Sequence, residues 1–221
     1  MTIPFDPTKH IPDVNHWEGV IDFDRFKPRR IITKLTEGRN FGDPLAGYTL
    51  RHAKERGIPR ETYHFGTASD DPFDQIRVYA AALFGVYWTV DEEGLSLDLE
   101  SRSIPARWRV LGTLGIRKNF RPFVIALVRA TIEVLRVVPR IYTRMTFWNP
   151  YVGPIRWRDY NLPQIRLHAA DYGIDGLGGG ITGPRWIDRV SFPDGADLWQ
   201  FTDKGRADGV PGALDLNLER A

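Results

Sequence analysis

The sequence predicts an α/β fold, namely an irregular TIM-like (β/α) barrel formed by a single domain over residues 1–221. Short β-rich segments alternate with helical segments, an order that is typical of parallel strands joined by helices. The chain has 221 residues, whereas a complete eightfold barrel typically needs about 250, so we expect an incomplete or irregular barrel. No repeat or linker-like tract divides the sequence into smaller units.

The first half of the chain carries four clear local signals. Asp43-Pro44 and Asp71-Pro72 each place a capping carboxylate before a proline, a pair that favours the first turn of a helix. Apolar residues then keep helical spacing in both segments. The expected elements are a strand at 31–36, a helix that starts at Pro44 and stops before Gly57, a strand at 62–65 and a helix from Pro72 to Leu83.

The second half alternates in the same way but contains less helix near its end. Regularly spaced apolar residues predict an amphipathic helix within 123–138, and the charges of Arg129, Glu133 and Arg136 exclude a membrane span there. The Gly-rich tract 176–183 lacks the spacing of a nucleotide-binding loop and is expected to be a flexible loop. The expected strands are 95–100, 140–143, 166–172 and 197–202.

Composition and short motifs exclude several classes of function. With 30 Lys and Arg against 28 Asp and Glu, the net charge of +2 is too small to indicate a nucleic-acid partner. The absence of cysteine excludes disulfides, thiol nucleophiles and cysteine-ligated zinc. The histidines show no metal-binding spacing and there is no G-x-S-x-G motif, so we expect no metal, no cofactor and no serine nucleophile. The N-terminus has no apolar run of signal-peptide length, so no classical secretion signal is expected.

The segment Leu95-Ser-Leu-Asp-Leu-Glu100 is the strongest candidate for chemistry. Side chains alternate along a strand, so the three leucines face one way while Asp98 and Glu100 share the other face. In a barrel the leucines would pack against helices, and the two acids would point inward at the carboxyl end of the strand, where the active sites of such barrels lie. For these six residues alone, a half-exposed strand with both acids in water is the alternative.

Two further acids are expected near strand ends, Asp13 close to the start of the chain and Asp215 close to its end. Several carboxylates in one pocket repel one another when ionised, so one of them should have a raised pKa and act as a general acid. Paired acids of this kind suit glycoside hydrolysis. The sequence leaves open whether the reaction retains or inverts the configuration of the sugar.

Seven short motifs, in this order, resemble those of the glycoside hydrolase family 25 lysozymes, the N-acetylmuramidases of bacteria and phages. Together they span roughly residues 11–217, which would then form the core of one catalytic domain. Two positions depart from the family pattern, because Asn15 stands where many relatives have Ser and His168 stands where a Trp is expected. The motifs are Asp13–Gly19, Ile32–Gly38, Tyr63–Phe65, Leu97–Glu100, Ile141–Thr143, Leu198–Thr202 and Gly212–Asn217.

The resemblance implies an irregular barrel that cleaves the β-1,4 bond between N-acetylmuramic acid and N-acetylglucosamine in peptidoglycan. By position, Glu100 matches the general acid of the family and Asp98 the partner carboxylate that stabilises developing charge. Asp13 and Asp215 match two further acids of the family's site. The D-x-E arrangement is shared with glycosidases in which the substrate's own N-acetyl group attacks the anomeric carbon, so Asp98 either orients that group or forms a covalent bond itself.

Four aromatic residues occupy positions that the family uses around the sugar cleft. An aromatic face matches the apolar face of a pyranose, and a phenol hydroxyl can hydrogen-bond a ring substituent. Plain core packing is the alternative for each of them, and it is favoured for the tryptophan taken alone. These predicted substrate contacts are Tyr63, Tyr142, Tyr172 and Trp199.

Two histidines and one ion pair receive structural interpretations. His64 and His168 are expected to be buried, hydrogen-bonded side chains rather than catalytic bases. Lys34 and Glu37 either line the pocket as an ion pair or support their strand, and the second interpretation is favoured.

Two other functions remain open for this sequence. One is a weakly active or inactive glycan-binding or structural module of a phage particle, suggested by His168, and the other is a glycosidase that acts on chitin-like polymers. Peptidoglycan strands are the expected partner, and acids gathered in one pocket would leave a basic exterior that favours approach to an anionic wall. Without a secretion signal the protein would reach the wall by cell lysis, by holin release or on a virion, which leads to the hypothesis of phage origin.

Overall fold

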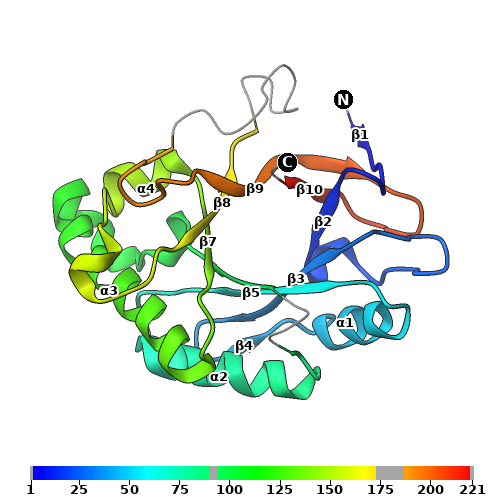
Figure 1. Cartoon of the computed structure of the whole chain (residues 1–221), viewed down its shortest axis with the longest axis horizontal. Coiled ribbons are helices and arrows are strands. Elements are labelled where there is room, and N and C mark those ends of the chain that lie inside the picture. Colours follow the sequence, from blue (N-terminus) through cyan, green and yellow to red (C-terminus); the bar gives the residue numbers. More distant parts are fainter. Residues whose placement is uncertain (1, 90–93, 173–186, 220–221) are drawn as a thin grey trace.

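The computed structural model describes residues 2–89, 94–172 and 187–219, and the Gly-rich tract 176–183 lies outside them. Eight of the described strands form a closed ring (Figure 1). In order around the ring they are β9 (Ala196–Arg206), β10 (Leu214–Glu219), β2 (Ile11–Val14), β3 (Ile31–Glu37), β5 (Arg60–Phe65), β6 (Gly94–Asp98), β7 (Arg140–Thr143) and β8 (Arg166–Ala170), which pairs again with β9.

The strand β10 explains how a short chain closes a complete ring. It is antiparallel to both β9 and β2, whereas the other neighbouring strands in the ring run parallel. An antiparallel strand can follow its neighbour through a short loop, while a parallel one needs a long crossover. The predicted irregular (β/α) barrel is therefore confirmed, and its ring of strands is complete.

Two short strands lie outside the ring. β1 (Ile3–Pro4) pairs in parallel with β9, and β4 (Phe41–Gly42) pairs antiparallel with the end of β3.

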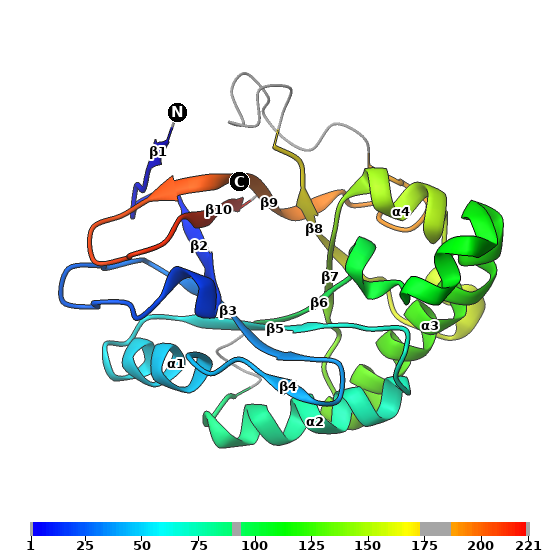
Figure 2. The same cartoon turned by 180° about the vertical axis from the view of Figure 1, so that it is seen from behind.

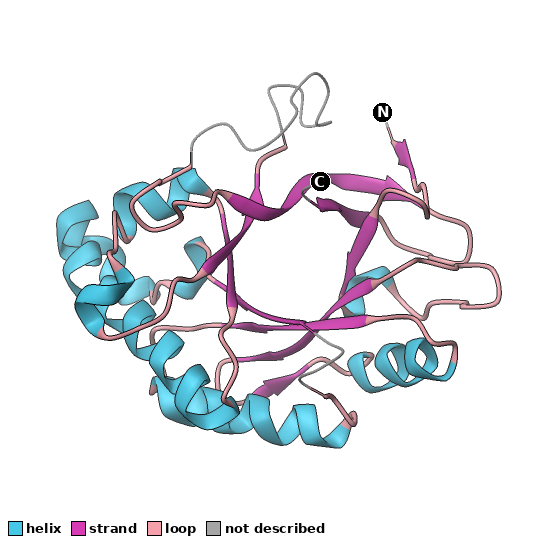
Figure 3. Ribbon diagram, in the orientation of Figure 1, coloured by secondary structure: helices cyan, strands magenta, loops and turns pink. Residues whose placement is uncertain are grey.

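The described helices cover the side of the ring that β3 to β8 form, whereas β9, β10 and β2 face mainly coil (Figure 3). None of them is long and apolar enough to cross a membrane. They are α1 (Ala46–Glu55), α2 (Pro72–Gly85), α3 (Gly112–Leu135) and α4 (Met145–Tyr151), with short 3-10 helices η1 (His16–Glu18), η2 (Ser101–Ser103), η3 (Ala106–Leu111) and η4 (Trp157–Tyr160).

The helix α3 differs most from the sequence-based expectation. It begins at Gly112 rather than near residue 123, and it ends at Leu135, after which Arg136 adopts a left-handed conformation with φ of 59°. Gly115 and Pro122 have poor helix propensity and hide the first three turns from a pattern search. Burial of Ile116 and Phe120 in the main apolar cluster stabilises those turns instead.

The other elements follow the predicted pattern with shifted ends. The side chain of Asp71 accepts hydrogen bonds at the start of α2, as the Asp-Pro pair predicts. Both β6 and β8 end two residues earlier than expected, and β9 extends four residues further, to Arg206.

Alternation along the strands separates two environments. Leu95, Leu97 and Leu99 face outward into the main apolar cluster beneath the helices, as predicted. A second cluster on the outer side of β2 and β9 contains Val14 and Phe201. Inside the ring, a small apolar group of Ile11, Ile32 and Leu198 packs under Tyr63.

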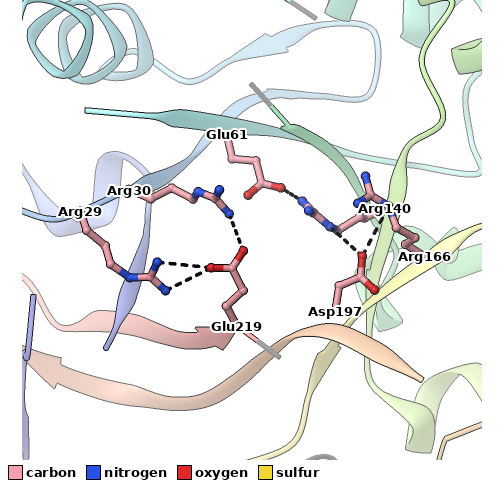
Figure 4. A network of polar contacts seen from close by, with 7 residues as sticks. All are labelled: Arg29, Arg30, Glu61, Arg140, Arg166, Asp197 and Glu219. Carbon is pink, nitrogen blue, oxygen red and sulfur yellow. Dashed lines mark hydrogen bonds and ion pairs between the residues drawn. The ribbon is translucent and has the colours of Figure 1, made fainter. Parts of the chain in front are cut away.

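An ion-pair network closes the end of the barrel where the parallel strands begin (Figure 4). Arg140 at the start of β7 pairs with Glu61 of β5, whose side chain is 2% exposed, and its Nε lies 3.5 Å from Asp197 of β9. Arg166 also pairs with Asp197 at 3.4 Å. Glu219 at the end of β10 receives Arg29 and Arg30 at 3.3 and 3.0 Å. The four acids selected from the sequence lie at the opposite end of the barrel, where the parallel strands finish. They are Asp13, Asp98, Glu100 and Asp215.

Candidate active site

A narrow pit of about 50 Å³ reaches from the carboxyl ends of the parallel strands into the ring. Its walls come from six different strands and the turn after β6, so residues far apart in sequence meet there. The lining residues are Asp13, Ile32, Tyr63, Ser96, Asp98, Glu100, Tyr142 and His168.

Glu100 and Asp98 share one face of the same segment, as the alternation predicted. Asp98 is the last residue of β6, where it stands opposite Phe65 of β5 and Tyr142 of β7. Glu100 immediately precedes the 3-10 helix η2, where its backbone carbonyl accepts the N–H of Ser103 at 2.9 Å and its own N–H donates to Ser103 Oγ at 3.0 Å. These contacts fix Glu100 at the mouth of the pit, with 30% of its side chain exposed.

Asp98 lies deeper than Glu100 and has an unused hydrogen-bonding atom. It is 8% exposed, and its Oδ1 is buried without a partner among the described residues. The hydroxyl of Ser96, two residues earlier on the same face, is buried and unpartnered in the same way. Buried polar atoms are almost always paired in folded proteins, so these two are suited to a polar group of a ligand.

Asp13 and Asp215 complete a group of four carboxylates. They stand directly opposite each other in the antiparallel pair of β2 and β10. Their apolar neighbours Val14, Leu214 and Leu216 pack in the outer cluster, which leaves both acids facing the interior. The structure thus brings together all four acids that the sequence singled out.

Burial raises the pKa of all four carboxyl groups. The pKa values of Asp13 and Asp98 lie well above their usual range, chiefly through burial and then through the neighbouring charges of Asp215 and Glu100 respectively. Burial raises the pKa of Asp215 to about 7, with further contributions from Glu18 and Asp203. The expectation that at least one of several crowded acids has a raised pKa agrees with this arrangement.

The pKa of Glu100 is the most finely balanced of the group. Burial raises it, whereas the nearby cations Arg144, Arg102 and Lys34 lower it. A carboxyl group whose pKa is raised moderately, and which is reached from outside, has the properties of a general acid.

Gln200 connects three predicted residues and was not identified from the sequence. Its Oε1 accepts hydrogen bonds from the hydroxyls of Tyr142 at 2.7 Å and Tyr172 at 2.6 Å, and its Nε2 donates to Asp215 Oδ2 at 3.2 Å. Its place in the motif Leu198–Thr202, on the face of β9 opposite Trp199, was the available signal.

Arg144 is the second functional candidate that the sequence analysis missed. Its guanidinium stacks over the Tyr172 ring at 4.3 Å, and its Nε lies 3.9 Å from Glu100 Oε1. It immediately follows β7, so the rule that active-site residues follow barrel strands could have identified it. Together with Glu100 it lines a groove of about 290 Å³ whose other walls are Ser101, Thr146, Phe147 and Tyr151. Pit and groove therefore meet at Glu100.

The predicted aromatic contacts fall in different places. Tyr63 and Tyr142 line the pit, and Tyr172 lies beside it through Gln200 and Arg144. Trp199 packs in the outer apolar cluster, is 7% exposed, and donates its indole N–H to the Asp171 carbonyl at 2.7 Å. Its contact with substrate stays a prediction.

The two histidines have the structural surroundings that the sequence analysis favoured. His168 is 1% exposed at the side of the pit, its Nε2 lies 2.6 Å from Asn217 Oδ1, and burial lowers its pKa to about 3. His64 lies between Thr36 Oγ1 at 2.8 Å and Gln75 Oε1 at 3.3 Å, and burial lowers its pKa to about 4. Both rings are therefore neutral at pH 7.

Lys34 is closer to the carboxylates than the favoured interpretation implied. Its Nζ pairs with Glu37 at 2.6 Å and lies over the rings of Phe41 and Phe65. The same charge lowers the pKa values of Asp13, Asp98 and Glu100. The ion pair thus supports β3 and also contributes to the electrostatics of the pit.

Glu18 is a further acid near the pit that the sequence analysis did not select. It is 9% exposed, accepts the backbone N–H of Asn15, and raises the pKa values of Asp13 and Asp215. The capping spacing from Asn15 to Glu18 was visible in the sequence. No group of three or more His, Asp or Glu side chains in the described part of the chain is placed to hold a metal ion.

Comparison with known sequences gives one family and several curated relatives. The family model described as Glycosyl hydrolases family 25 matches residues 12–210. Lysozyme M1 of Streptomyces globisporus is 28% identical over 218 residues, which cover 93% of this chain and 65% of that protein. The uncharacterized protein YegX of Escherichia coli K12 is 23% identical over 224 residues, which cover 98% of this chain and 71% of that protein. The chain thus spans slightly less than two thirds of lysozyme M1.

Solved structures with this architecture include a bacterial lysozyme and a muramidase. The bacterial lysozyme from Streptomyces coelicolor superposes with a TM-score of 0.76 at 22% identity, covering 96% of this chain and 92% of that one. The muramidase from Acremonium alcalophilum gives a TM-score of 0.71 at 21% identity, with 96% and 94% covered. At these identities the likeness shows the fold.

Proposed function

Because the chain belongs to glycoside hydrolase family 25, we propose that it is a lysozyme-type muramidase. Its substrate is peptidoglycan, and the bond cleaved is the β-1,4 bond between N-acetylmuramic acid and N-acetylglucosamine. The observation that carries the proposal is the pit in which Asp98 lies deep and unpartnered while Glu100 stands at the mouth. Two carboxyl groups at different depths suit two different roles in glycoside hydrolysis.

Glu100 acts as the general acid. It is the residue shared by the pit and the groove, so a glycan strand lying along the groove would bring its glycosidic oxygen to this carboxyl group. The raised pKa favours the protonated form of Glu100, which transfers its proton to that oxygen as the bond to the anomeric carbon breaks. Arg144 and Arg102 limit the rise, so that the proton can still be released.

Asp98 stabilises the positive charge that develops at the sugar ring. Its buried Oδ1 is a hydrogen-bond acceptor without a partner among the described residues, which suits the N–H of a 2-acetamido group. Held in this way, the acetamido oxygen would attack the anomeric carbon as the bond to the protonated glycosidic oxygen breaks. Water would then attack the same carbon and open the cyclic intermediate. We favour this role over a covalent bond to Asp98, because the buried Oδ1 lacks a hydrogen-bond donor among the described residues and the acetamido N–H would supply one.

The remaining predicted residues assist these two. In their ionised forms, Asp13 and Asp215 add negative potential around the cationic transition state. The hydroxyls of Tyr142 and Tyr172 are aligned by Gln200, and Tyr63 lines the pit beside Ser96. We propose that these residues contact the sugar, together with Trp199.

A clearing assay on purified peptidoglycan tests the proposal. We expect Glu100→Gln and Asp98→Asn each to lower the rate by about 10²–10⁴-fold, the usual contribution of such groups. Glu133→Gln, an exposed acid on α3, is the matched control and should retain full activity. A Glu100→Gln variant as active as wild type would refute the catalytic assignment. Cleavage of chitin oligomers without cleavage of cell walls would refute the assignment of peptidoglycan as the substrate.

A further inference from the structure

The segment from Ser101 to Arg121 is distinguished by its charge. It contains six Lys and Arg residues and no Asp or Glu, and the next acid in the chain is Glu133. In the rest of the chain the acids outnumber the Lys and Arg residues, so the small net charge conceals a strong local excess. We call residues 101–121 the arginine-rich segment. Its cations are Arg102, Arg107, Arg109, Arg117, Lys118 and Arg121.

The arginine-rich segment also exposes large apolar side chains. Val110 is 86% exposed, Leu111 48% and Leu114 78%, all within five consecutive residues. Single exposed apolar residues are common on protein surfaces, whereas a group of three on one turn requires an explanation. Trp108 lies at the edge of this group, half-buried against the main apolar cluster.

The local structure places cations and apolar groups on the same surface. Residues three apart in a 3-10 helix eclipse each other, which puts Arg107 beside Val110 on η3. Leu111, Leu114 and Lys118 then follow the helical spacing of one face at the start of α3. The opposite face of α3 is buried through Ile116 and Phe120, so the mixed surface points to solvent.

The cations of this surface are available to a partner. In the described part of the chain, Arg107, Arg109 and Lys118 take part in no ion pair, and all three are exposed. By contrast, Arg117 is occupied, because it donates to the carbonyls of Asn149 and Pro150 within α4. That contact fixes the start of α3 against α4, whose residues line the groove beyond Glu100. Figure 2 shows α3 and α4 together on one flank of the barrel.

We propose that the arginine-rich segment binds the surface of an anionic lipid bilayer. Arginines attract the headgroups, while Val110, Leu111 and Leu114 enter the boundary between headgroups and acyl chains, the combination typical of interfacial helices. A soluble polyanion would use the cations but would gain nothing from three exposed aliphatic side chains. The segment begins at the residue after Glu100, so a bound protein would hold its groove beside the membrane.

Vesicle sedimentation tests this proposal with the whole chain. Wild type should bind phosphatidylglycerol vesicles at least tenfold more tightly than phosphatidylcholine vesicles, and salt should weaken the binding. Each cation near an anionic surface contributes about fivefold, so Arg107→Gln with Arg109→Gln should weaken binding by about 25-fold. Val110→Ser with Leu114→Ser leaves the charge unchanged and should weaken it about tenfold or more.

A matched control separates the lipid surface from general charge effects. Arg156 and Arg158 are also exposed arginines on either side of a tryptophan, so Arg156→Gln with Arg158→Gln should bind vesicles within about twofold of wild type. Circular dichroism and thermal unfolding confirm that each variant is folded. The proposal is overturned if wild type does not bind, if the serine variant binds as wild type does, or if the surface instead forms a dimer that the serine variant dissociates.

Discussion

Asp215→Asn should stabilise the protein at alkaline pH, although it alters the proposed active site. The pKa of Asp215 is raised to about 7 from its usual 3.8, mainly because the carboxyl group is buried and secondarily because Glu18 and Asp203 lie near it. The folded state therefore holds a proton that the unfolded chain releases. The folded protein therefore loses stability as pH rises from the usual pKa of 3.8 to the folded pKa of about 7. The substitution removes this loss of stability.

The expected size follows from the same linkage. One pKa unit corresponds to about 1.4 kcal/mol, so the shift corresponds to about 4 kcal/mol at pH 8 and to less than about 1 kcal/mol at pH 4. The repulsion between Asp215 and Asp13, which face each other across β10 and β2, is removed as well. A gain of this size is a large fraction of the total stability of a typical domain, about 5–15 kcal/mol.

Denaturant unfolding at the two pH values measures the effect. Asp215→Asn should raise the free energy of unfolding at pH 8 and leave it almost unchanged at pH 4, while activity on peptidoglycan falls. Asp159→Asn is the control, since that side chain is 59% exposed and lies on η4, and it should change neither value. An equal effect of Asp215→Asn at both pH values, or destabilisation at pH 8, would refute the view that the buried charge of Asp215 destabilises the folded protein.

Three further predictions concern other parts of the molecule. Arg140→Met should destabilise the protein by about 3–5 kcal/mol, because the buried Glu61 loses its cation, and adding Glu61→Leu should recover most of that loss in urea unfolding. Arg144→Gln should move the alkaline limit of kcat to higher pH, since Arg144 lowers the pKa of the acid Glu100, whereas Arg144→Lys should leave the limit in place; an unchanged limit in both would exclude this coupling. The pKa of His168 in the folded state is about 3, so the protein loses stability as pH falls below about 6.5. His168→Asn should therefore reduce the difference in unfolding free energy between pH 7 and pH 4 by about 3 kcal/mol. The same difference in wild type and variant would contradict this pKa.

Local signals were sufficient for most of the fold. Asp71-Pro72 predicted a helix start that the structure confirms, because capping depends on neighbouring residues only. Closure of the ring by β10 was not predicted, since it depends on pairing between strands at opposite ends of the chain. The early start of α3 was missed because packing of Ile116 and Phe120 overrides the poor propensity of its glycines and proline.

The candidate site also contains some features that one strand's sequence predicts and others that need the assembled ring. Asp98 and Glu100 could be paired from sequence, because alternation along one strand determines their common face. Gln200 and Arg144 act through residues on other strands, so their roles depend on the register of the whole ring. The depth of Asp98 relative to Glu100, on which their proposed division of roles rests, also required the assembled structure.

Analysis of the reducing ends released from digested peptidoglycan tests the assignment of Glu100 and of the bond most directly. Wild type should release fragments whose new reducing end is N-acetylmuramic acid, identified by reduction and mass spectrometry. Glu100→Gln, folded as wild type is, should release almost none. Fragments that end in N-acetylglucosamine, or muramic ends released equally by Glu100→Gln, would contradict the proposed bond or the proposed acid.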